Sequence, residues 1–346
     1  MRIVVADSQV PFVTGGAELL ARELVTALRA AGHEVEPVAL PFRWFPPDQA
    51  LNAVLAARLV DLAESAAGPI NRVIALRFPA TCVRHPDKVV WLLHQHREAY
   101  DLWDTPYGSL AATPGGEAVR SSIVRADREF LGEARRVYTI SRNVSARLSR
   151  FNGIDSTPLY HPPPDHGSIR VGDGEDFLFF PSRIAPLKRQ TLAVEAMQHA
   201  PPGLRLVVAG AAESPADADR LDRLVEAAGV ADRVTLLGPV ARPELLDLYA
   251  RCRAVVFPPF DEDYGYVTLE AFFAGKPVLT CTDSGGPLEF VRDGETGVVA
   301  EPSPGALGEA IGRLDRERAR RLGHNAHDLV DSLDLSWARV VAELLG

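Results

Sequence analysis

The sequence predicts an α/β protein with two domains, each built on a doubly wound parallel sheet. Short runs rich in Val, Ile and Leu alternate with longer stretches of helical periodicity, a pattern typical of parallel strands that helices cover on both faces. The alternation stops once, at a segment rich in Pro, Gly and Asp, and then resumes. The length of 346 residues suits about two domains.

The first series of strands is predicted within residues 1–160. Its apolar runs are residues 3–6, 35–40, 73–76, 89–93 and 137–140. After the first run, Leu20, Leu24 and Leu28 recur at helical spacing, and Gly32 is placed to end that helix. We therefore expect residues 1–160 to form an N-terminal Rossmann-like domain.

Residues 161–176, "HPPPDHGSIRVGDGED", are predicted to be a linker because of their Pro, Gly and Asp content. A second Rossmann-like domain is predicted for residues 177–332, because apolar runs again alternate with helical patterns there. Pro243 suits the first turn of one of these helices. These runs are residues 177–180, 204–209, 234–237, 254–257, 278–280 and 298–300. Residues 333–346 contain an apolar helical stretch, for which packing across both domains is one arrangement that the sequence allows.

Composition narrows the class of protein. The net charge of −9 argues against a general nucleic-acid binder. Three widely spaced cysteines and no apolar run of membrane-spanning length favour a cytoplasmic protein. Eight arginines and three acids lie between Arg120 and Arg150, and "PFRWFPP" occupies residues 41–47. The arginine-rich segment is interpreted either as ordinary helix surface or as a contact with an acceptor or with the inner face of a membrane. Residues 41–47 are interpreted either as core or as one of the same two contacts. The oligomeric state stays open.

Candidate binding residues follow the strands, because ligands of such folds bind at the carboxyl ends of the strands. Gly15 and Gly16 directly precede the first helix, where backbone and helix terminus suit an anion. Arg183 and Lys188 follow residues 177–180 and suit a pyrophosphate. A polar cluster follows residues 89–93 and consists of His94, His96, Arg97 and Asp101. Its H-x-H could also bind metal, although no further ligand set is evident.

The stretch "DEDYGYVTLEAFFAGKPV" begins at Asp261 and follows another predicted strand. Glu262 lies in its loop, and Glu270 lies eight residues later in an apolar helical pattern. A buried carboxylate is costly unless it is hydrogen-bonded, so either the fold or a ligand must satisfy Glu270. A second glycine pair, Gly285 and Gly286, follows residues 278–280.

These motifs resemble those of the retaining glycosyltransferases of family four, which have the GT-B fold of two facing Rossmann-like domains with an inter-domain cleft. The resemblance covers nearly the whole chain. The family's E-x7-E reads "EDYGYVTLE" here, followed by "AFFAGKPV" and by the glycine turn "DSGG". Where the family commonly has Glu-Gly-Phe-Gly, this chain has "EDYG". The D-x-D within "DED" is interpreted as coincidental.

The resemblance implies roles for these positions. Glu270 would hold the ribose hydroxyls of a sugar nucleotide, and Glu262 would contact the donor sugar. Arg183 and Lys188 would bind the diphosphate. Other donor-side positions would be Gly15, Gly16, Val240, Gly265, Tyr266 and Val267. His94 would lie near the reacting sugar, with acceptor-side candidates His96, Arg97, Asp101 and Ser141.

The implied activity is transfer of a sugar, with retention, from a nucleotide-diphosphate sugar to a hydroxyl acceptor that is a glycan, a lipid-linked compound or a natural product. No metal or other cofactor is expected. The implied route is front-face attack in which the departing phosphate takes the acceptor proton, with Glu262 as the candidate nucleophile if a covalent route is used. The alternatives are a GT-B-type epimerase or phosphorylase and a non-catalytic binder of nucleotide sugars.

Overall fold

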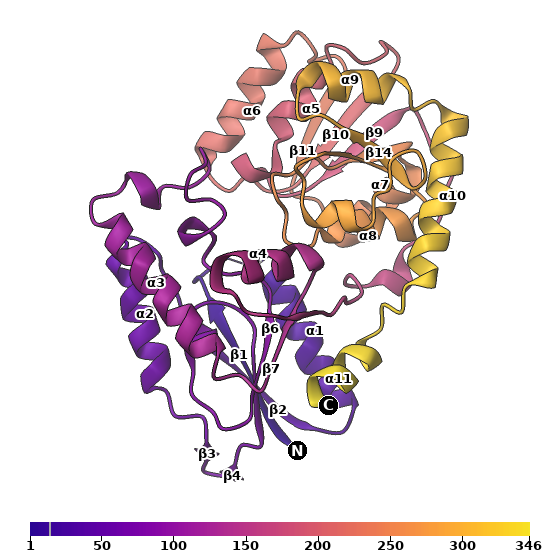
Figure 1. Ribbon diagram of the computed structural model, residues 1–346. Helices are drawn as coiled ribbons and strands as arrows, with labels where there is room; N and C mark the ends of the chain where they lie inside the picture. Colours follow the sequence, from indigo (N-terminus) through magenta and orange to yellow (C-terminus); the bar gives the residue numbers. More distant parts are fainter. Residues whose placement is uncertain (14) are drawn as a thin grey trace. The chain divides into compact units, whose positions relative to one another are not determined.

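A computed structural model describes residues 1–13 and 15–346. The chain forms two compact units (Figure 1). Unit 1 comprises residues 1–164 and 335–346, and unit 2 comprises residues 165–334. The chain thus leaves unit 1 once and returns to it at its C-terminal end.

Unit 1 contains a sheet of six parallel strands in the order β2-β1-β5-β6-β7-β8. The strands are β1 (Arg2–Gln9), β2 (Glu34–Pro41), β5 (Arg72–Ala75), β6 (Lys88–Leu92), β7 (Arg136–Thr139) and β8 (Thr157–Pro158). The inner strands are buried along their length, which explains their unbroken apolar runs. Strand order reverses between β1 and β5, so the loops after these two strands meet at a topological switch point.

The helices of unit 1 are α1 (Gly16–Ala30), α2 (Asp48–Leu59), α3 (Gly116–Leu131), α4 (Arg142–Asn152) and α11 (Trp337–Leu345). Shorter elements are β3 (Glu64–Ser65), β4 (Gly68–Pro69), η1 (Ala80–Cys82), η2 (Arg97–Ala99) and η3 (Leu110–Ala112). Helix α1 ends before Gly32, whose φ of +85° suits glycine. Helix α11 packs on the rest of unit 1. The Arg72 guanidinium donates to the Leu344 and Leu345 carbonyls at the end of α11, at 2.9 and 2.5 Å. A contact of α11 with unit 2 stays a prediction.

Unit 2 contains a second sheet of six parallel strands in the order β11-β10-β9-β12-β13-β14. The strands are β9 (Phe177–Pro181), β10 (Arg205–Ala209), β11 (Val234–Gly238), β12 (Ala254–Val256), β13 (Val278–Cys281) and β14 (Gly297–Ala300). The helices are η4 (His166–Ser168), η5 (Pro186–Lys188), α5 (Gln190–Ala196), α6 (Pro215–Ala227), α7 (Arg242–Arg251), α8 (Tyr266–Phe273), η6 (Gly286–Glu289), α9 (Pro304–Gly312) and α10 (Arg316–Ser332). The two predicted doubly wound sheets are confirmed, and the switch point of unit 2 lies between β9 and β12.

A buried polar chain in unit 1 ties α3 to the loop after β6. The Tyr100 hydroxyl donates to the Asp127 carboxyl at 2.7 Å, and Asn152 donates to the Tyr100 hydroxyl at 3.3 Å. Gln95 donates to Asn152 at 2.6 Å. Burial raises the pKa of Asp127 from 3.8 to about 7 and outweighs the hydrogen bond from Tyr100. The carboxyl is therefore largely protonated in the folded unit at slightly acid pH.

We expect this group to make unit 1 less stable as the pH rises. The pKa of Asp127 is higher in the folded chain than in the unfolded chain. Its contribution to the free energy of unfolding is therefore complete below about pH 4 and is lost as the pH rises through about 7. The loss is roughly 4 kcal/mol at 1.36 kcal/mol per unit. The Asp127→Asn variant should remove most of this decline, because an amide accepts the Tyr100 hydrogen bond without a charge.

Urea unfolding at pH 5 and pH 8 measures the effect. All four tryptophans, Trp44, Trp91, Trp103 and Trp337, belong to unit 1, so tryptophan fluorescence reports the unfolding of that unit. Asp104→Asn is the matched control, because Asp104 is exposed and should keep the wild-type decline. Equal declines in Asp127→Asn and wild type would contradict the assignment.

Candidate functional site

Lys188 and Glu262 form an ion pair at the switch point of unit 2. Lys188 ends η5 after β9, and Glu262 lies in the loop after β12. The Lys188 ammonium contacts the Glu262 carboxylate, and both side chains are about four-fifths buried. The sequence predicted both residues as site residues from different strand ends, and the fold brings them together. Ligands of doubly wound sheets bind at the switch point, at the carboxyl ends of the strands. A partly buried charged pair at this position is therefore a candidate for ligand binding.

The glycine turn holds the Glu262 loop in place. The Glu262 N–H donates to the Ser284 carbonyl at 2.9 Å, and the Gly286 N–H donates to the Glu262 carbonyl at 2.7 Å. A Cβ at Gly286 would lie 2.9 Å from the Asp263 carbonyl oxygen and the Tyr264 Cα. The second glycine pair therefore has a packing reason, namely the close approach of two backbone segments.

Helix α8 begins at the predicted glycine and leads to the second carboxylate. Gly265 has a φ of +85°, and Tyr266 and Val267 form the first turn after it. The backbone N–H groups of this turn lie at a helix start, where the helix dipole favours negative charge. Gly265, Tyr266 and Val267 thus lie after the Glu262 loop, and their donor-side role stays a prediction.

Glu270 has two protein partners. The Arg242 guanidinium donates to one carboxylate oxygen at 2.6 Å, and the Tyr249 hydroxyl donates to the other at 2.7 Å. Burial raises the pKa of Glu270 and outweighs the attraction of Arg242. The fold itself therefore satisfies this buried acid. Val240 lies just before α7, the helix that carries Arg242 and Tyr249.

Sequence reasoning missed Arg242 and Tyr249. Arg242 precedes the proline at the start of α7, and Tyr249 lies on that helix among leucines. Tyr249 has the pattern of a core residue, and its ring is buried. The signal that could have found it is its hydroxyl, since a buried tyrosine usually needs a hydrogen-bond partner.

Arg183 and Lys188 differ in environment. The Arg183 side chain is 46% exposed, and its guanidinium lies 3.7 Å from Glu213. The neighbouring Arg189 instead makes a bidentate pair with Asp283 at 2.7 and 2.8 Å. Both predicted cations follow β9. Within the described part of the chain, Lys188 contacts another predicted site residue, Glu262, and Arg183 lies near Glu213 instead. Joint action of Arg183 and Lys188 on one diphosphate stays a prediction.

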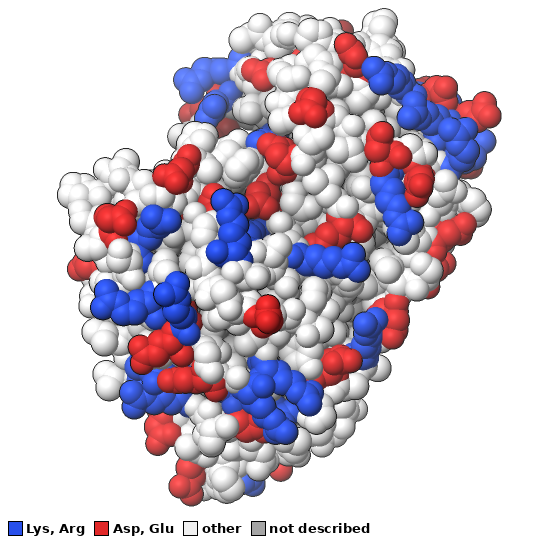
Figure 2. All heavy atoms as spheres, viewed as in Figure 1, with Lys and Arg blue, Asp and Glu red and all other residues white. Residues whose placement is uncertain are grey.

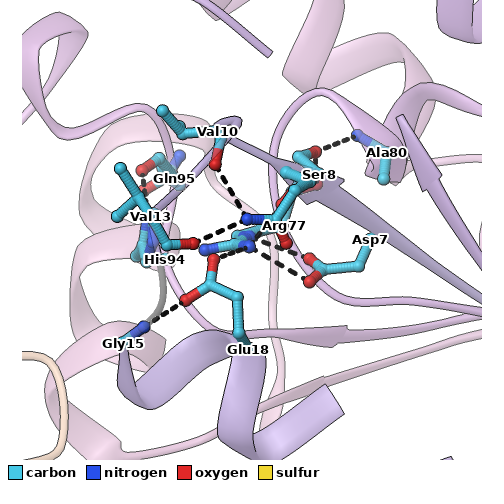
Figure 3. A network of polar contacts seen from close by, with 11 residues as sticks. Asp7, Ser8, Val10, Val13, Gly15, Glu18, Arg77, Ala80, His94 and Gln95 are labelled. Atoms are coloured by element: carbon cyan, nitrogen blue, oxygen red, sulfur yellow. Dashed lines mark hydrogen bonds and ion pairs between the residues drawn. The ribbon is translucent and has the colours of Figure 1, made fainter. Parts of the chain in front are cut away.

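The switch point of unit 1 is occupied by a charged network around Arg77 (Figure 3). Arg77 follows β5 and donates to both Asp7 oxygens at 2.8 and 3.1 Å. It also donates to Glu18 at 2.5 Å, and the other Glu18 oxygen accepts the Gly15 N–H at 2.7 Å. Gly16 begins α1. A carboxylate of the chain itself thus caps the predicted glycine turn.

The two acids of this network respond differently to it. Burial raises the pKa of Asp7 despite the attraction of Arg77. Burial acts in the same direction on Glu18, but the hydrogen bond and charge of Arg77, together with the Gly15 N–H, lower the pKa of Glu18 overall. Sequence reasoning missed Asp7, Glu18 and Arg77, although Arg77 is a polar residue directly after an apolar run.

His94 follows β6, as predicted, and lies near the same network in Figure 3. Its Nδ1 lies 2.8 Å from the Gln95 carbonyl oxygen. A carbonyl oxygen only accepts, so Nδ1 carries the hydrogen and Nε2 of the neutral ring can accept one. Burial lowers the pKa of His96 to about 4, so that ring is neutral at neutral pH.

The remaining acceptor-side candidates make structural contacts. Arg97 donates to Asp101 at 2.8 Å, and Arg147 lies 3.6 Å from the same carboxylate. The Ser141 hydroxyl accepts the Val144 N–H at 3.0 Å and caps α4. Their roles toward an acceptor stay predictions.

The arginine-rich segment makes similar contacts. Arg120 lies 4.5 Å from the Trp103 ring centroid and donates to the Ala99 carbonyl. Basic and acidic side chains intermingle over the face drawn in Figure 2. Within the described part of the chain, no helix is both long and apolar enough to cross a membrane. In residues 1–13 and 15–346, no three His, Cys, Asp or Glu side chains are grouped so as to hold a metal ion.

Known proteins resemble this chain in sequence and in fold. Residues 164–328 match the family described as glycosyl transferases group 1. A D-inositol 3-phosphate glycosyltransferase of Nocardia farcinica is 30% identical over 280 residues, which cover 74% of this chain and 61% of that protein. One of Mycolicibacterium paratuberculosis is 35% identical over 174 residues, or 48% of this chain and 38% of that protein. The chain thus spans less than two thirds of these relatives.

Solved structures match the chain along its whole length. Sucrose-phosphate synthase from Thermosynechococcus elongatus has a TM-score of 0.78 at 20% identity, covering 99% of this chain and 97% of that one. Anabaena Alr3699/HepE in complex with UDP and glucose has a TM-score of 0.73 at 18% identity, covering 100% and 98%. These likenesses show the fold. Residues 164–328 therefore belong to the glycosyl transferases group 1 family, and the chain has the GT-B fold.

Proposed function

We propose that the chain is a retaining glycosyltransferase that moves a sugar from a nucleotide-diphosphate sugar to a hydroxyl acceptor. The observation that carries the proposal is the Lys188–Glu262 pair at the switch point of unit 2. Glu262 lies in the loop that leads into α8, and the buried Glu270 follows it by eight residues. The names of the relatives support a glycosyltransferase. The complexes of a structural neighbour with UDP and glucose and with UDP-glucose support this donor class.

In this proposal the charges of unit 2 serve the donor. Lys188 and the first turn of α8 stabilise the negative charge that develops on the leaving diphosphate. Glu262 faces the donor sugar and is kept in place by the Gly286 turn. Glu270 accepts hydrogen bonds from the ribose hydroxyls, for which a carboxylate has spare acceptor capacity even with Arg242 and Tyr249 bound.

His94 acts on the acceptor side in this proposal. Its Nε2 accepts a hydrogen bond from the hydroxyl of the bound acceptor and so orients the acceptor oxygen. In the transfer step the same hydrogen moves from this contact to the departing diphosphate. No metal takes part, because Lys188 and Arg183 supply the positive charge. Turnover is therefore expected to persist with excess chelator, and loss of activity that manganese or magnesium restores would contradict this.

The ribose assignment gives the binding test. The Glu270→Gln variant keeps the size of the side chain and can still accept from Tyr249, but it presents a weaker acceptor to ribose. UDP is the first ligand to try. Its affinity should fall about tenfold, the size of one charge-assisted hydrogen bond. A 2′,3′-dideoxy analogue of UDP should bind wild type and variant about equally.

Calorimetric titration measures both ligands. Glu309→Gln is the control, since Glu309 is an exposed acid paired with Arg313, and it should leave both affinities unchanged. If the dideoxy analogue loses as much affinity as UDP, Glu270 does not bind the ribose. If no nucleotide diphosphate binds wild type, the proposed function itself is wrong.

A further inference from the structure

Two adjoining pockets of unit 1 lie beside His94. The inner pocket has a volume of about 240 Å³ and is bordered by Val10, Phe42, Trp44, Phe78, His94 and His96. The outer pocket, of about 480 Å³, shares Val10, Phe42 and Trp44 and continues over Phe45 and one face of α2. Together they form a continuous surface that begins at the histidine proposed to orient the acceptor.

Aromatic rings line this surface. Phe42 and Phe78 pack edge to face with centroids 5.8 Å apart, and the His96 ring lies 5.5 Å from Phe78. Trp44 is 38% exposed and Phe45 is 58% exposed, although burial of such rings is favourable. Exposed aromatic surface that borders a pocket is typical of a ligand site. The ring faces suit a flat, apolar ligand.

The charges around the inner pocket disfavour an anion. Arg77 already binds Asp7 and Glu18, and Arg97 binds Asp101. A phosphate here would meet two arginines that already bind carboxylates of the chain, and it would have to compete with those acids for them. His96 adds no charge at neutral pH, because burial lowers its pKa to about 4.

Two further charged residues border the surface. Glu98 adds a carboxylate, which accepts hydrogen bonds from the N–H groups of Ser109 and Leu110. Arg43 borders the outer pocket and lies over the Phe45 ring at 5.7 Å. It is exposed, so water screens its charge. An anion would thus meet an accessible cation at the outer, solvated end, away from His94.

The polar end of the pocket suits a hydroxyl. His94 Nε2 can accept a hydrogen bond, because Nδ1 donates to the Gln95 carbonyl. Gln95 is held in turn by Asn152 at 2.6 Å. The surface therefore offers a positioned hydrogen-bond acceptor for a hydroxyl beside the aromatic side chains.

We propose that these two pockets take the acceptor, and that this acceptor is an uncharged phenol or alcohol on a flat, apolar ring system rather than a phosphorylated polyol. The inference rests on the proposed function. In the transfer, the acceptor oxygen forms the bond to the anomeric carbon. The bond from that carbon to the diphosphate oxygen breaks, its electron pair stays with the diphosphate, and the diphosphate takes the hydroxyl proton.

The test compares three probes by calorimetry: 2-naphthol, 6-hydroxy-2-naphthoate, which has the same rings with a carboxylate, and myo-inositol 1-phosphate. We expect 2-naphthol to bind at least about tenfold more tightly than either anion. The Trp44→Ala and Phe42→Leu variants should each weaken 2-naphthol about three- to tenfold, through lost ring contacts. Leu59→Ala should leave binding unchanged, because Leu59 is an exposed residue at the end of α2 outside both pockets.

Tighter binding of myo-inositol 1-phosphate that is lost in Arg43→Gln would overturn the inference in favour of an anionic acceptor. Unchanged 2-naphthol affinity in both aromatic variants would also overturn it, because binding would then lie elsewhere. UDP titration of the same samples separates the two proposals. Wild type that binds UDP but none of the rings retains the proposed function without this acceptor class, whereas naphthol binding without any nucleotide binding contradicts the function.

Discussion

Replacing Lys188 with alanine should reduce turnover about 10²- to 10³-fold, the loss seen when a comparable stabilising donor is removed from a developing negative charge. Lys188 is four-fifths buried and contacts Glu262. In the alanine variant, water therefore has little access to the leaving group and stabilises its negative charge poorly. Donor affinity should fall less than turnover, because the leaving oxygen gains most of its charge in the transition state.

A double-mutant cycle separates Lys188 from its partner. Lys188→Ala leaves the Glu262 carboxylate without this cation, so part of the loss could come from that carboxylate. The Lys188→Ala and Glu262→Gln double variant should therefore lose less than the sum of the single changes. Arg183→Ala should cost less than Lys188→Ala, because Arg183 is more exposed.

The measurements are turnover at saturating donor and affinity for the nucleotide diphosphate. A donor with a less basic leaving group should partly rescue Lys188→Ala. No rescue, or a change confined to affinity, would show that Lys188 does not assist departure of the leaving group.

The second large effect is on stability. Arg77→Met should destabilise unit 1 by about 3–5 kcal/mol, because removing one partner of a buried ion pair leaves uncompensated charge behind. Asp7 and Glu18 are both mostly buried, and the Arg77 guanidinium is the cation that both of them contact. The penalty should shrink as the pH falls through about 4, where the acids of the unfolded chain become protonated, and further as it falls through the lowered folded pKa of Glu18, because an uncharged acid no longer needs the guanidinium.

Tryptophan fluorescence in urea measures this change in unit 1. The matched control is Arg2→Met, because Arg2 also pairs with an acid in the same sheet, at 2.9 Å, but Glu34 is 75% exposed. An exposed pair contributes about 0–1 kcal/mol, so this control should change little. Equal effects of the two substitutions would contradict the importance of burial.

The sequence was sufficient to predict the strands and the backbone turns of the site. Unbroken apolar runs identify buried parallel strands such as β9 and β12, and the residues that follow them must meet at one edge of the sheet. That rule predicts that Lys188 and Glu262 lie close together.

The partners of the buried charges were not predictable in the same way. Glu270 pairs with Arg242 and Tyr249, which are 28 and 21 residues earlier in the chain. Arg77 reaches Asp7, 70 residues earlier. Such pairs depend on how one loop or helix packs against another. The spacing of residues within one segment of the sequence does not predict this packing. Ser141 is the reverse case, since a serine before a helix is a local signal for a cap.

The return of the chain to unit 1 has a consequence for biosynthesis. Residues 335–346 are translated after the whole of unit 2, yet Arg72 of an inner strand of unit 1 donates to the Leu344 and Leu345 carbonyls, and Tyr138 donates to the Glu343 carbonyl. Unit 2 is continuous and can fold as soon as it has emerged from the ribosome, whereas unit 1 stays incomplete until residues 335–346 have emerged as well. A premature stop near residue 335 would therefore damage unit 1, whose synthesis began first, and leave unit 2 complete.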